Sequence, residues 1–300
     1  MERKISLAIC DFIPKYGLEK TLDIAKEVGA DGIDFDLNRY NLYGDNDSIY
    51  LKSDAEIEAH FKAIREEVEK RGLVVFQTHG TMRTFMENDE EYNTVVFPKN
   101  AEGDLKAARI LGAKYCVFHP GSDLSNPNAT PEEMRFRARR AFKSILPFAK
   151  ENGVKVALET VGSNWNLGNK LDFFGAYDEF KALFDDVRMS EFGEWFVCCI
   201  DTGHINLTAQ HNEPSAAEFV RKLGKNVACL HLHDNFGIVD HHRVIGAGTT
   251  DWTDFFKALK EVGYEGVYNS EANFGYISDN LMIATADFTV KTIKSFASRY

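Results

Sequence analysis

The chain has 300 residues, of which 44% are hydrophobic and 27% are charged, and its formal net charge is −11. This composition allows a large buried core, and the negative charge gives no support for broad nucleic-acid binding. No apolar run is long enough to span a bilayer, and the start lacks the shape of a signal peptide. The five cysteines lie in apolar runs without metal-type spacing, so we expect buried free thiols in a cytoplasmic protein.

Short apolar runs alternate with segments of helical periodicity along the whole chain. The runs predict strands at residues 5–10, 32–36, 73–79, 115–119, 155–159, 195–201, 227–233 and 266–271. Between and after them, helices are predicted at residues 18–28, 55–70, 101–111, 131–150, 176–184, 216–223, 254–262 and 279–298. Several helices end at a glycine just before the next strand, as in KEVGADGIDF and KENGVKVALE, which is typical of a left-handed C-cap.

The predicted strands are short and apolar on both faces, which is typical of a parallel sheet buried on both sides. The alternation of strands and helices predicts the α/β class, and eight strand–helix units predict a (β/α)8 TIM barrel. We expect this barrel to form a single domain over residues 1–300. An open doubly wound sheet is the alternative. Polar candidates end at least six strands, and only a closed barrel gathers six strand ends around one axis.

Seven of the nine histidines lie in short patches that follow apolar runs, often beside an acid. The patches, two of which contribute only an acid, read QTHG, VFHPGSD, ALETVG, CIDTGH, LHLHDN, VDHHR and YNSEANF. A lone histidine in such a place is usually a hydrogen-bonded core residue. Imidazole and carboxylate are, however, the ligands of borderline divalent ions. Their repetition at strand ends therefore predicts one convergent metal site.

Four side chains at the ends of the last four strands suit one divalent ion with positions left open for a substrate. These predicted ligands are Glu159, Asp201, His233 and Glu271. Their oxygen atoms favour Mn or Mg, and the imidazole admits Zn or Co. A strand-end carboxylate also commonly caps the next helix, and this alternative stays open for Glu159 and Asp201.

The segments ALETVG, IDTGHINL, HLHDN, DHHRVIGAGTTDW and NSEANF resemble the xylose-isomerase-like TIM-barrel superfamily. The resemblance runs over about residues 7–296. This superfamily contains sugar isomerases and tagatose/psicose 3-epimerases, inosose-converting enzymes and the endonuclease IV nucleases. It implies that Glu159, Asp201, His233 and Glu271 form the shared metal quartet. It also implies that His204 is the substrate-contacting or metal-binding histidine of a DTxH motif.

The endonuclease IV branch implies three zinc ions with nine ligands, and all nine positions are filled here. By this resemblance the first zinc takes His79, His119 and Glu159, the second takes the quartet, and the third takes His204, Asp240 and His242. The acidic loop RYNLYGDNDS does not suit a phosphate-facing surface. The stretch GTMRTF after His79 also differs from the nuclease pattern. Both features favour a sugar enzyme.

We therefore expect a sugar or inosose isomerase or epimerase that uses Mn, Zn, Mg or Co and a metal-stabilised enediolate. Glu159 and Glu271 would serve as its two acid/bases. The predicted substrate contacts are His79, His119, His204, Trp165, Arg243 and Phe274. For the two aromatic residues, simple loop packing is the alternative.

An endonuclease IV-like phosphodiesterase acting on abasic DNA is the second hypothesis, and a barrel that binds sugar or metal without turnover is the third. We expect no membrane partner and no nucleic-acid partner. The family resemblance implies a homodimer or a homotetramer.

Overall fold

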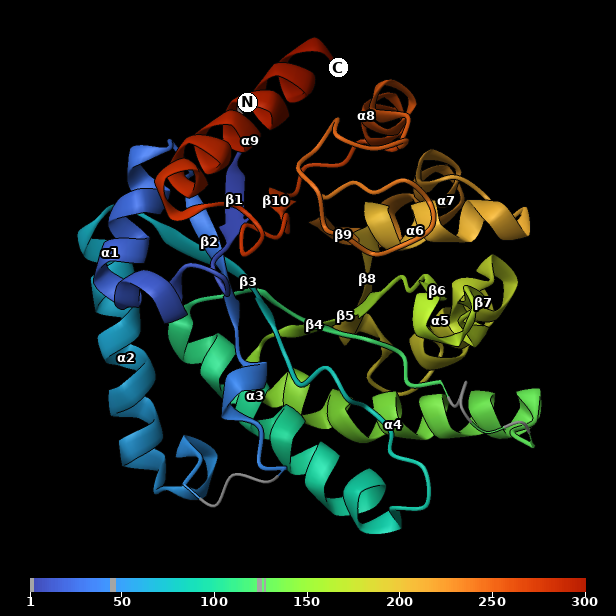
Figure 1. Cartoon of the computed structure of the whole chain (residues 1–300). Coiled ribbons are helices and arrows are strands. Elements are labelled where there is room, and N and C mark those ends of the chain that lie inside the picture. The colour runs from blue at the N-terminus through green and yellow to red at the C-terminus, as the bar shows by residue number, and fades with distance from the viewer. Residues whose placement is uncertain (1–2, 44–46, 123–125, 127) are drawn as a thin grey trace.

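The computed structural model describes residues 3–43, 47–122, 126 and 128–300. Parallel strands form its centre and helices surround them (Figure 1). The strands of the central sheet are β1 Ile5–Ala8, β2 Gly32–Asp36, β3 Val74–His79, β4 Tyr115–Phe118, β5 Lys155–Glu159, β8 Phe196–Asp201, β9 Val227–His231 and β10 Tyr268–Ser270. They neighbour one another in the order β10-β1-β2-β3-β4-β5-β8-β9.

The two ends of this order meet just beyond β9. The Leu232 N–H donates to the Asn269 carbonyl at 2.8 Å, and the Glu271 N–H donates to the Leu232 carbonyl at 3.1 Å. A parallel bridge between Leu232 and Ser270 results. The predicted (β/α)8 barrel is therefore confirmed.

The surrounding helices follow the strands in alternation, as predicted. They are α1 Ile13–Glu27, α2 Asp54–Lys70, α3 Phe97–Leu111, α4 Pro131–Asn152, α5 Tyr177–Arg188, α6 Thr202–Thr208, α7 Ala216–Leu223, α8 Trp252–Glu261 and α9 Asp279–Arg299. The glycines of the predicted helix ends have φ between 66° and 87°, which confirms left-handed caps at Gly29, Gly72, Gly112, Gly153 and Gly263. Helix α6 and the hairpin of β6 Ser163–Asn164 and β7 Lys170–Leu171 were not predicted from the sequence.

The hydrophobic core has an outer and an inner part. The larger part lies between the strands and the helices. The smaller part lies inside the barrel and consists of Val117, Ala157, Val197, Cys199 and Cys229, from β4, β5, β8 and β9. On the other side of the interior, β1, β2, β3 and β10 bury the polar side chains of Ser6, Asp34, Gln77 and Asn269. The barrel interior is thus apolar on one side and polar on the other.

The prediction of five buried thiols holds for four of them and is wrong for Cys10. Cys116, Cys198, Cys199 and Cys229 are buried, whereas Cys10 is exposed. The reason is that β1 ends at Ala8, so Cys10 lies in the loop beyond the strand.

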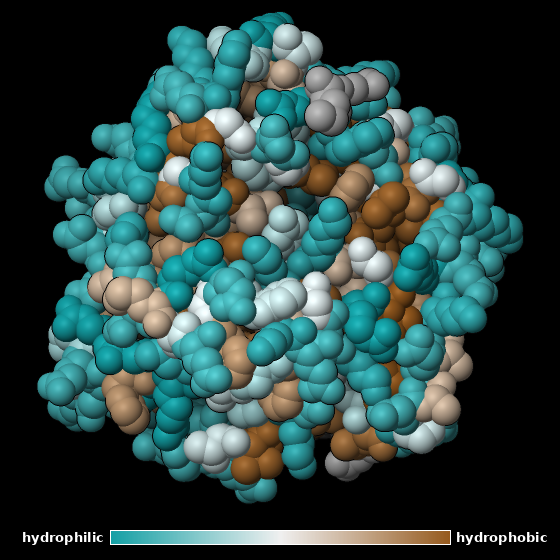
Figure 2. Space-filling view, turned by 180° about the vertical axis from the view of Figure 1, so that it is seen from behind, coloured by the Kyte–Doolittle hydropathy of each residue, from teal (hydrophilic) through white to brown (hydrophobic). Residues whose placement is uncertain are grey.

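Two observations describe the outside of the molecule. No helix in the described part of the chain combines the length and the apolarity that crossing a membrane requires. On the face opposite the view of Figure 1, hydrophilic side chains cover most of the surface, and hydrophobic ones appear between them in small groups (Figure 2).

Candidate metal centre

The barrel gathers its acids and histidines at the carboxyl ends of the strands, where the loops of this fold build active sites. His79, Glu159, Asp201 and His231 are the last residues of β3, β5, β8 and β9. Other polar side chains reach the same place from the residues that follow β4, β8, β9 and β10. These are His119, His204, His233, Asp240, His242 and Glu271.

The central group surrounds the Nδ1 atom of His231. This atom lies 3.1 Å from Glu159 Oε1, 3.3 Å from Glu271 Oε2 and 4.0 Å from Asp201 Oδ2. Ligands placed tetrahedrally at about 2.0–2.2 Å from one ion are about 3.3–3.6 Å apart. His231 Nδ1 and both carboxylate oxygens of Glu159 are buried, with no hydrogen-bond partner in the described part of the chain. Because such orphaned atoms are rare in folded proteins, this group fits a divalent ion.

A second group shares Glu159 with the first. His79 Nε2 and His119 Nε2 lie 3.3 Å from each other, and they lie 3.3 and 3.0 Å from Glu159 Oε2. The Nδ1 atom of His79 is 3.0 Å from the carbonyl of Gly80, so its N–H has an acceptor there. That contact leaves Nε2 as the nitrogen that can bind an ion.

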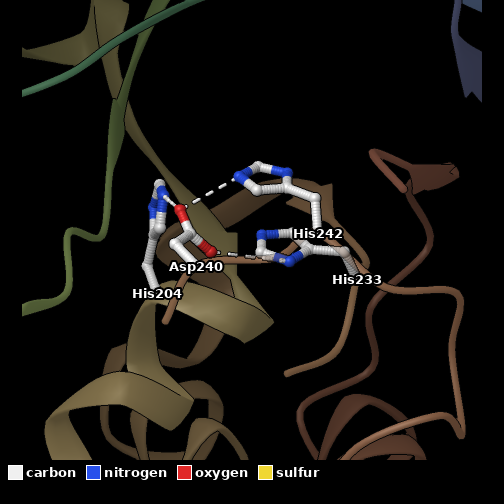
Figure 3. A group of neighbouring side chains, drawn as sticks. All are labelled: His204, His233, Asp240 and His242. Atoms are coloured by element: carbon white, nitrogen blue, oxygen red, sulfur yellow. Dashed lines mark hydrogen bonds and ion pairs between the residues drawn. The ribbon is translucent and has the colours of Figure 1, made fainter. Parts of the chain in front are cut away.

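A third group is centred on Asp240, between His204 and His242 (Figure 3). Asp240 Oδ2 lies 3.2 Å from His204 Nε2 and 3.0 Å from His242 Nε2. The rings of His233 and His242 stack with their centroids 3.7 Å apart. His242 has φ of 45°, an uncommon conformation for a residue other than glycine, and such strain is often found at functional sites.

The geometry of the described residues differs from the predicted quartet at one position. The residue that groups with Glu159, Asp201 and Glu271 is His231, while His233 joins the third group. His233 still contacts the quartet, because its Nε2 lies 2.9 Å from Asp201 Oδ2. The physical reason is that β9 ends at His231, two residues earlier than predicted. His231 belongs to the same LHLHDN patch, so the signal for it was present in the sequence.

Asp201 is both a helix cap and a member of the centre. Its Oδ1 accepts the N–H of His204 at 2.6 Å and so caps α6, while its Oδ2 faces His231 and His233. The cap places His204 beside the central group. Gly203 leaves room for His233, since an added Cβ would lie 2.0 Å from Cε1 of that ring.

Asp234 anchors the loop that carries Asp240 and His242. Its carboxylate accepts the N–H groups of Gly246, Gly248 and Thr250 at 3.0–3.2 Å and the indole N–H of Trp252 at 2.8 Å. The pattern HDN followed by GAGTTDW therefore encodes a loop anchor. Asp240 and His242 lie between these two motifs and belong to the third group, together with His233 of HDN.

The contacts within the centre shift its pKa values in opposite directions. Burial lowers the pKa of His79 and of His242, but in each case a neighbouring carboxylate outweighs it. The pKa of His79 rises to about 9 beside Glu159, and the pKa of His242 rises to about 9 beside Asp240. Burial raises the pKa of Glu159, but His231 and His119 hold it well below its usual range. Burial raises the pKa of Glu271 to about 7, although His231 opposes the rise. A divalent ion would compete with these protons for the same lone pairs.

A polar cavity of about 260 Å³ opens beside the second and third groups. His119, His204 and Asp240 line it, together with side chains of the loop after β5. His119 and His204, which were predicted to contact a substrate, therefore reach this cavity. His79 lies beside it, in contact with His119.

Two other predicted substrate contacts, Phe274 and Arg243, lie elsewhere. Phe274 is fully buried, and its ring centroid lies 5.1 Å from that of Phe12 in the core, which agrees with the packing alternative. Arg243 is exposed, with its guanidinium 4.9 Å from the Phe236 ring, and it lines a different cavity. The side chain of Trp165 lies outside the described part of the structure.

Known proteins resemble this chain in sequence. It is 29% identical over 171 residues to the uncharacterized protein MJ1311 of Methanocaldococcus jannaschii, covering 56% of this chain and 53% of that protein. It is 23% identical over 208 residues to an L-ribulose 3-epimerase of Methylomonas sp., covering 65% and 64%. A probable endonuclease 4 of Pediococcus pentosaceus is 27% identical over 165 residues, covering 52% and 50%. The chain thus spans between half and two thirds of the length of these relatives.

Solved structures share the fold over nearly the whole chain. A D-tagatose 3-epimerase-like protein superposes with a TM-score of 0.73 at 20% identity, covering 98% of this chain and 97% of the other. The IolI protein with a bound zinc atom superposes with a TM-score of 0.74 at 19% identity, covering 99% of each. The family described as xylose isomerase-like TIM barrel matches residues 22–286. The chain therefore belongs to the xylose isomerase-like TIM barrel family.

Proposed function

We propose that the protein is a divalent-metal-dependent isomerase or epimerase of a neutral sugar or sugar derivative. The observation that carries this proposal is the chemistry of the cavity beside the centre. Among the described residues that line it, none is Lys or Arg; the polar ones are His119, Ser163, Asn164, Asn166, Asp172, His204 and Asp240. Hydroxyl, amide and imidazole groups can pair with sugar hydroxyls, whereas the two carboxylates would repel a phosphate.

Glu159 and Glu271 are the proposed acid/base pair. A divalent ion, when bound, polarises a carbonyl and makes the neighbouring C–H bond more acidic. The two carboxylates come from β5 and from the end of β10, and both approach His231 Nδ1 within 3.3 Å. One carboxylate would remove the proton and the other would return it. His119 and His204, at the edge of the cavity, would hold the substrate hydroxyls.

The relatives support this choice through what their names state. They include an L-ribulose 3-epimerase in sequence and a D-tagatose 3-epimerase-like protein in fold. The zinc atom of the IolI structure supports a divalent ion as the cofactor, with Mn, Mg and Co as the other candidates.

The test is proton exchange with solvent. The protein is incubated with a panel of ketoses, aldoses and inososes in deuterated water containing Mn, Mg, Co or Zn. We expect deuterium at the carbon next to the carbonyl of at least one sugar, detected by mass spectrometry and NMR. The proposal fails if no sugar of the panel exchanges or converts with any of the four ions.

A metal-dependent phosphodiesterase is the second candidate, because the structure offers several neighbouring groups that could hold an ion. Clustered ions can generate a hydroxide and clamp a phosphate, and one relative is named as a probable endonuclease 4. The same preparation is therefore tested on a DNA duplex with an abasic site. Metal-dependent cleavage of that duplex without sugar exchange would replace the first proposal with this one.

A further inference from the structure

A polar layer lies inside the barrel next to His231. Its central member is Asp34 of β2, whose side chain is almost fully buried. The Oδ2 atom of Asp34 accepts an amide N–H of Gln77 at 2.8 Å and one of Asn269 at 3.0 Å. The same oxygen lies 3.3 Å from Nε2 of His231. Ser6 donates from the far side to Asn269 and completes the layer.

His231 thus spans two sets of carboxylates. Its Nδ1 faces Glu159 and Glu271, while its Nε2 faces Asp34. The ring is fully buried, and neither of its nitrogens makes a hydrogen bond of regular geometry within the described part of the chain. The contacts with these carboxylates are therefore the polar contacts that the ring nitrogens have. An ion at the central group would take the Nδ1 lone pair, and the proton of the neutral ring would then have to sit on Nε2.

Three other histidines of the centre also have one ring nitrogen beside an acid and the other beside a second oxygen acceptor. The Nδ1 atoms of His79, His204 and His242 lie 2.9–3.0 Å from the backbone carbonyls of Gly80, Thr160 and Glu271. Each ring therefore offers Nε2 to the acids and keeps its other nitrogen on a fixed acceptor. His231 is turned the other way round, and a side chain takes the place of the backbone carbonyl.

We propose that Asp34 is a positioning residue that holds the Nε2–H of His231 and so keeps its Nδ1 lone pair directed at the ion of the central group. This inference rests on the metal site of the proposed function. A carboxylate accepts hydrogen bonds and donates none, so Asp34 permits only the tautomer of His231 that carries its proton on Nε2. Acceptors of this kind orient metal-binding histidines, and their loss typically costs about 10–100-fold in metal affinity.

The competing explanation is that Asp34 only satisfies the amides of Gln77 and Asn269. A neutral side chain could accept those two hydrogen bonds without bringing a carboxylate into the barrel, where an unpaired charge is costly. Among the described residues, His231 is the one basic group within ion-pair distance of Asp34. The choice of aspartate is therefore explained by the histidine and not by the amides.

The test compares Asp34→Asn with Gln77→Met. The Asp34→Asn variant keeps the size of the side chain, but its amide can turn an N–H toward His231 and allow the wrong tautomer. The Gln77→Met variant removes one hydrogen bond to Asp34 and leaves the contact with His231 in place. Cobalt affinity is measured by competition with a chelator, the ligand field by the visible absorption of bound cobalt, and stability by thermal unfolding.

We expect Asp34→Asn to weaken cobalt binding at one site by about 10–100-fold and to shift the absorption band of that ion. Gln77→Met should lower the unfolding temperature but leave the affinity and the band as in the wild type. Equal affinity in wild type and Asp34→Asn, or an equal loss in both variants, overturns the role of Asp34 alone. A wild-type protein that binds no cobalt, zinc or manganese overturns both this inference and the metal site beneath it.

Discussion

Glu159 is buried and Glu271 is half-buried, and their surroundings shift the pKa values of the two carboxyl groups in opposite directions. Histidines surround Glu159 and hold its pKa well below the usual range, despite burial. Burial raises the pKa of Glu271 to about 7, and Glu159 contributes to the rise. Pairs of acids whose surroundings separate their pKa values are typical of acid/base catalysis. In the protein without its ion, the pKa of Glu271 is therefore the one of the two that lies near neutral pH.

Replacing either carboxylate with an amide should abolish most of the proposed turnover. Glu271→Gln and Glu159→Gln keep the shape of the side chain but remove the proton acceptor, so we expect losses of about 10²–10⁴-fold in turnover. The deuterium exchange assay measures this. Glu265→Gln, an exposed change near β10, serves as the control and should keep full activity. Wild-type exchange rates in Glu271→Gln would remove this residue from the mechanism.

The choice between His231 and His233 shows where sequence reasoning reached its limit. Residues two apart on a strand face the same side, so alternation cannot separate them. The two histidines differ in their position along the chain, because His231 is the last residue of β9 and His233 lies in the loop two residues beyond it. The LHLHDN patch and its metal-binding chemistry were predictable from the sequence. The end of the strand was predicted two residues too late, and His233 was therefore predicted in the position that His231 occupies.

At the scale of elements, short α6 connects the end of β8 to the centre. It begins directly after Asp201, and its second residue, Gly203, lies under the ring of His233. The sequence did not reveal this helix, since seven residues carry too little periodicity to be read. Longer helices with clear caps, such as α2 and α4, were predicted to within two residues at each end.

Gly203→Ala should disturb the third group. The new Cβ would lie 2.0 Å from the His233 ring, so the ring or the start of α6 must move. We expect lower thermal stability and a loss of metal affinity. Gly275→Ala is the control, because its Cβ would meet nothing closer than the Asn273 side chain at 3.1 Å. Unchanged stability and metal affinity in Gly203→Ala would contradict the packing described for His233.

Trp252→Phe should weaken the anchor of the loop that carries Asp240 and His242. The change keeps most of the buried ring but removes the indole N–H that donates to Asp234 at 2.8 Å. Leaving part of that buried carboxylate unpaired should cost about 1–3 kcal/mol of unfolding free energy, measured by urea denaturation. Trp195→Phe is the matched control, since the buried indole N–H of Trp195 has no hydrogen-bond partner in the described part of the chain. Equal losses in both variants would argue against the anchor.

At the scale of the whole molecule, the central group joins four neighbouring strands of the barrel. Carboxylates on β5, on β8 and directly after β10 converge on one histidine of β9, so a bound ion would link these four elements. The closed barrel and its helices were predictable from repeated strand–helix periodicity. The distribution of polar side chains within the barrel was not, because it depends on which strands lie opposite one another.

Removing the ions should lower the stability of the whole barrel. A ligand that binds only the folded state stabilises it by about 2.7 kcal/mol at a free concentration of 100 times Kd. We therefore expect a chelator to lower the unfolding temperature of the wild type, and excess Zn or Mn to restore it. Asp201→Ala, which lacks one ligand of the central group, should respond much less. Equal responses in the two proteins would place the stabilising ion elsewhere.

The most direct test of the metal centre is the anomalous scattering of crystals grown with Zn or Mn. We expect a strong peak between Nδ1 of His231 and the carboxylates of Glu159, Asp201 and Glu271, whose oxygens lie 3.1–4.0 Å from that nitrogen. A further peak beside Asp240, His204 and His242 would add weight to the phosphodiesterase. Crystals saturated with either ion that show no peak at His231 would contradict the metal centre and the proton transfer built on it.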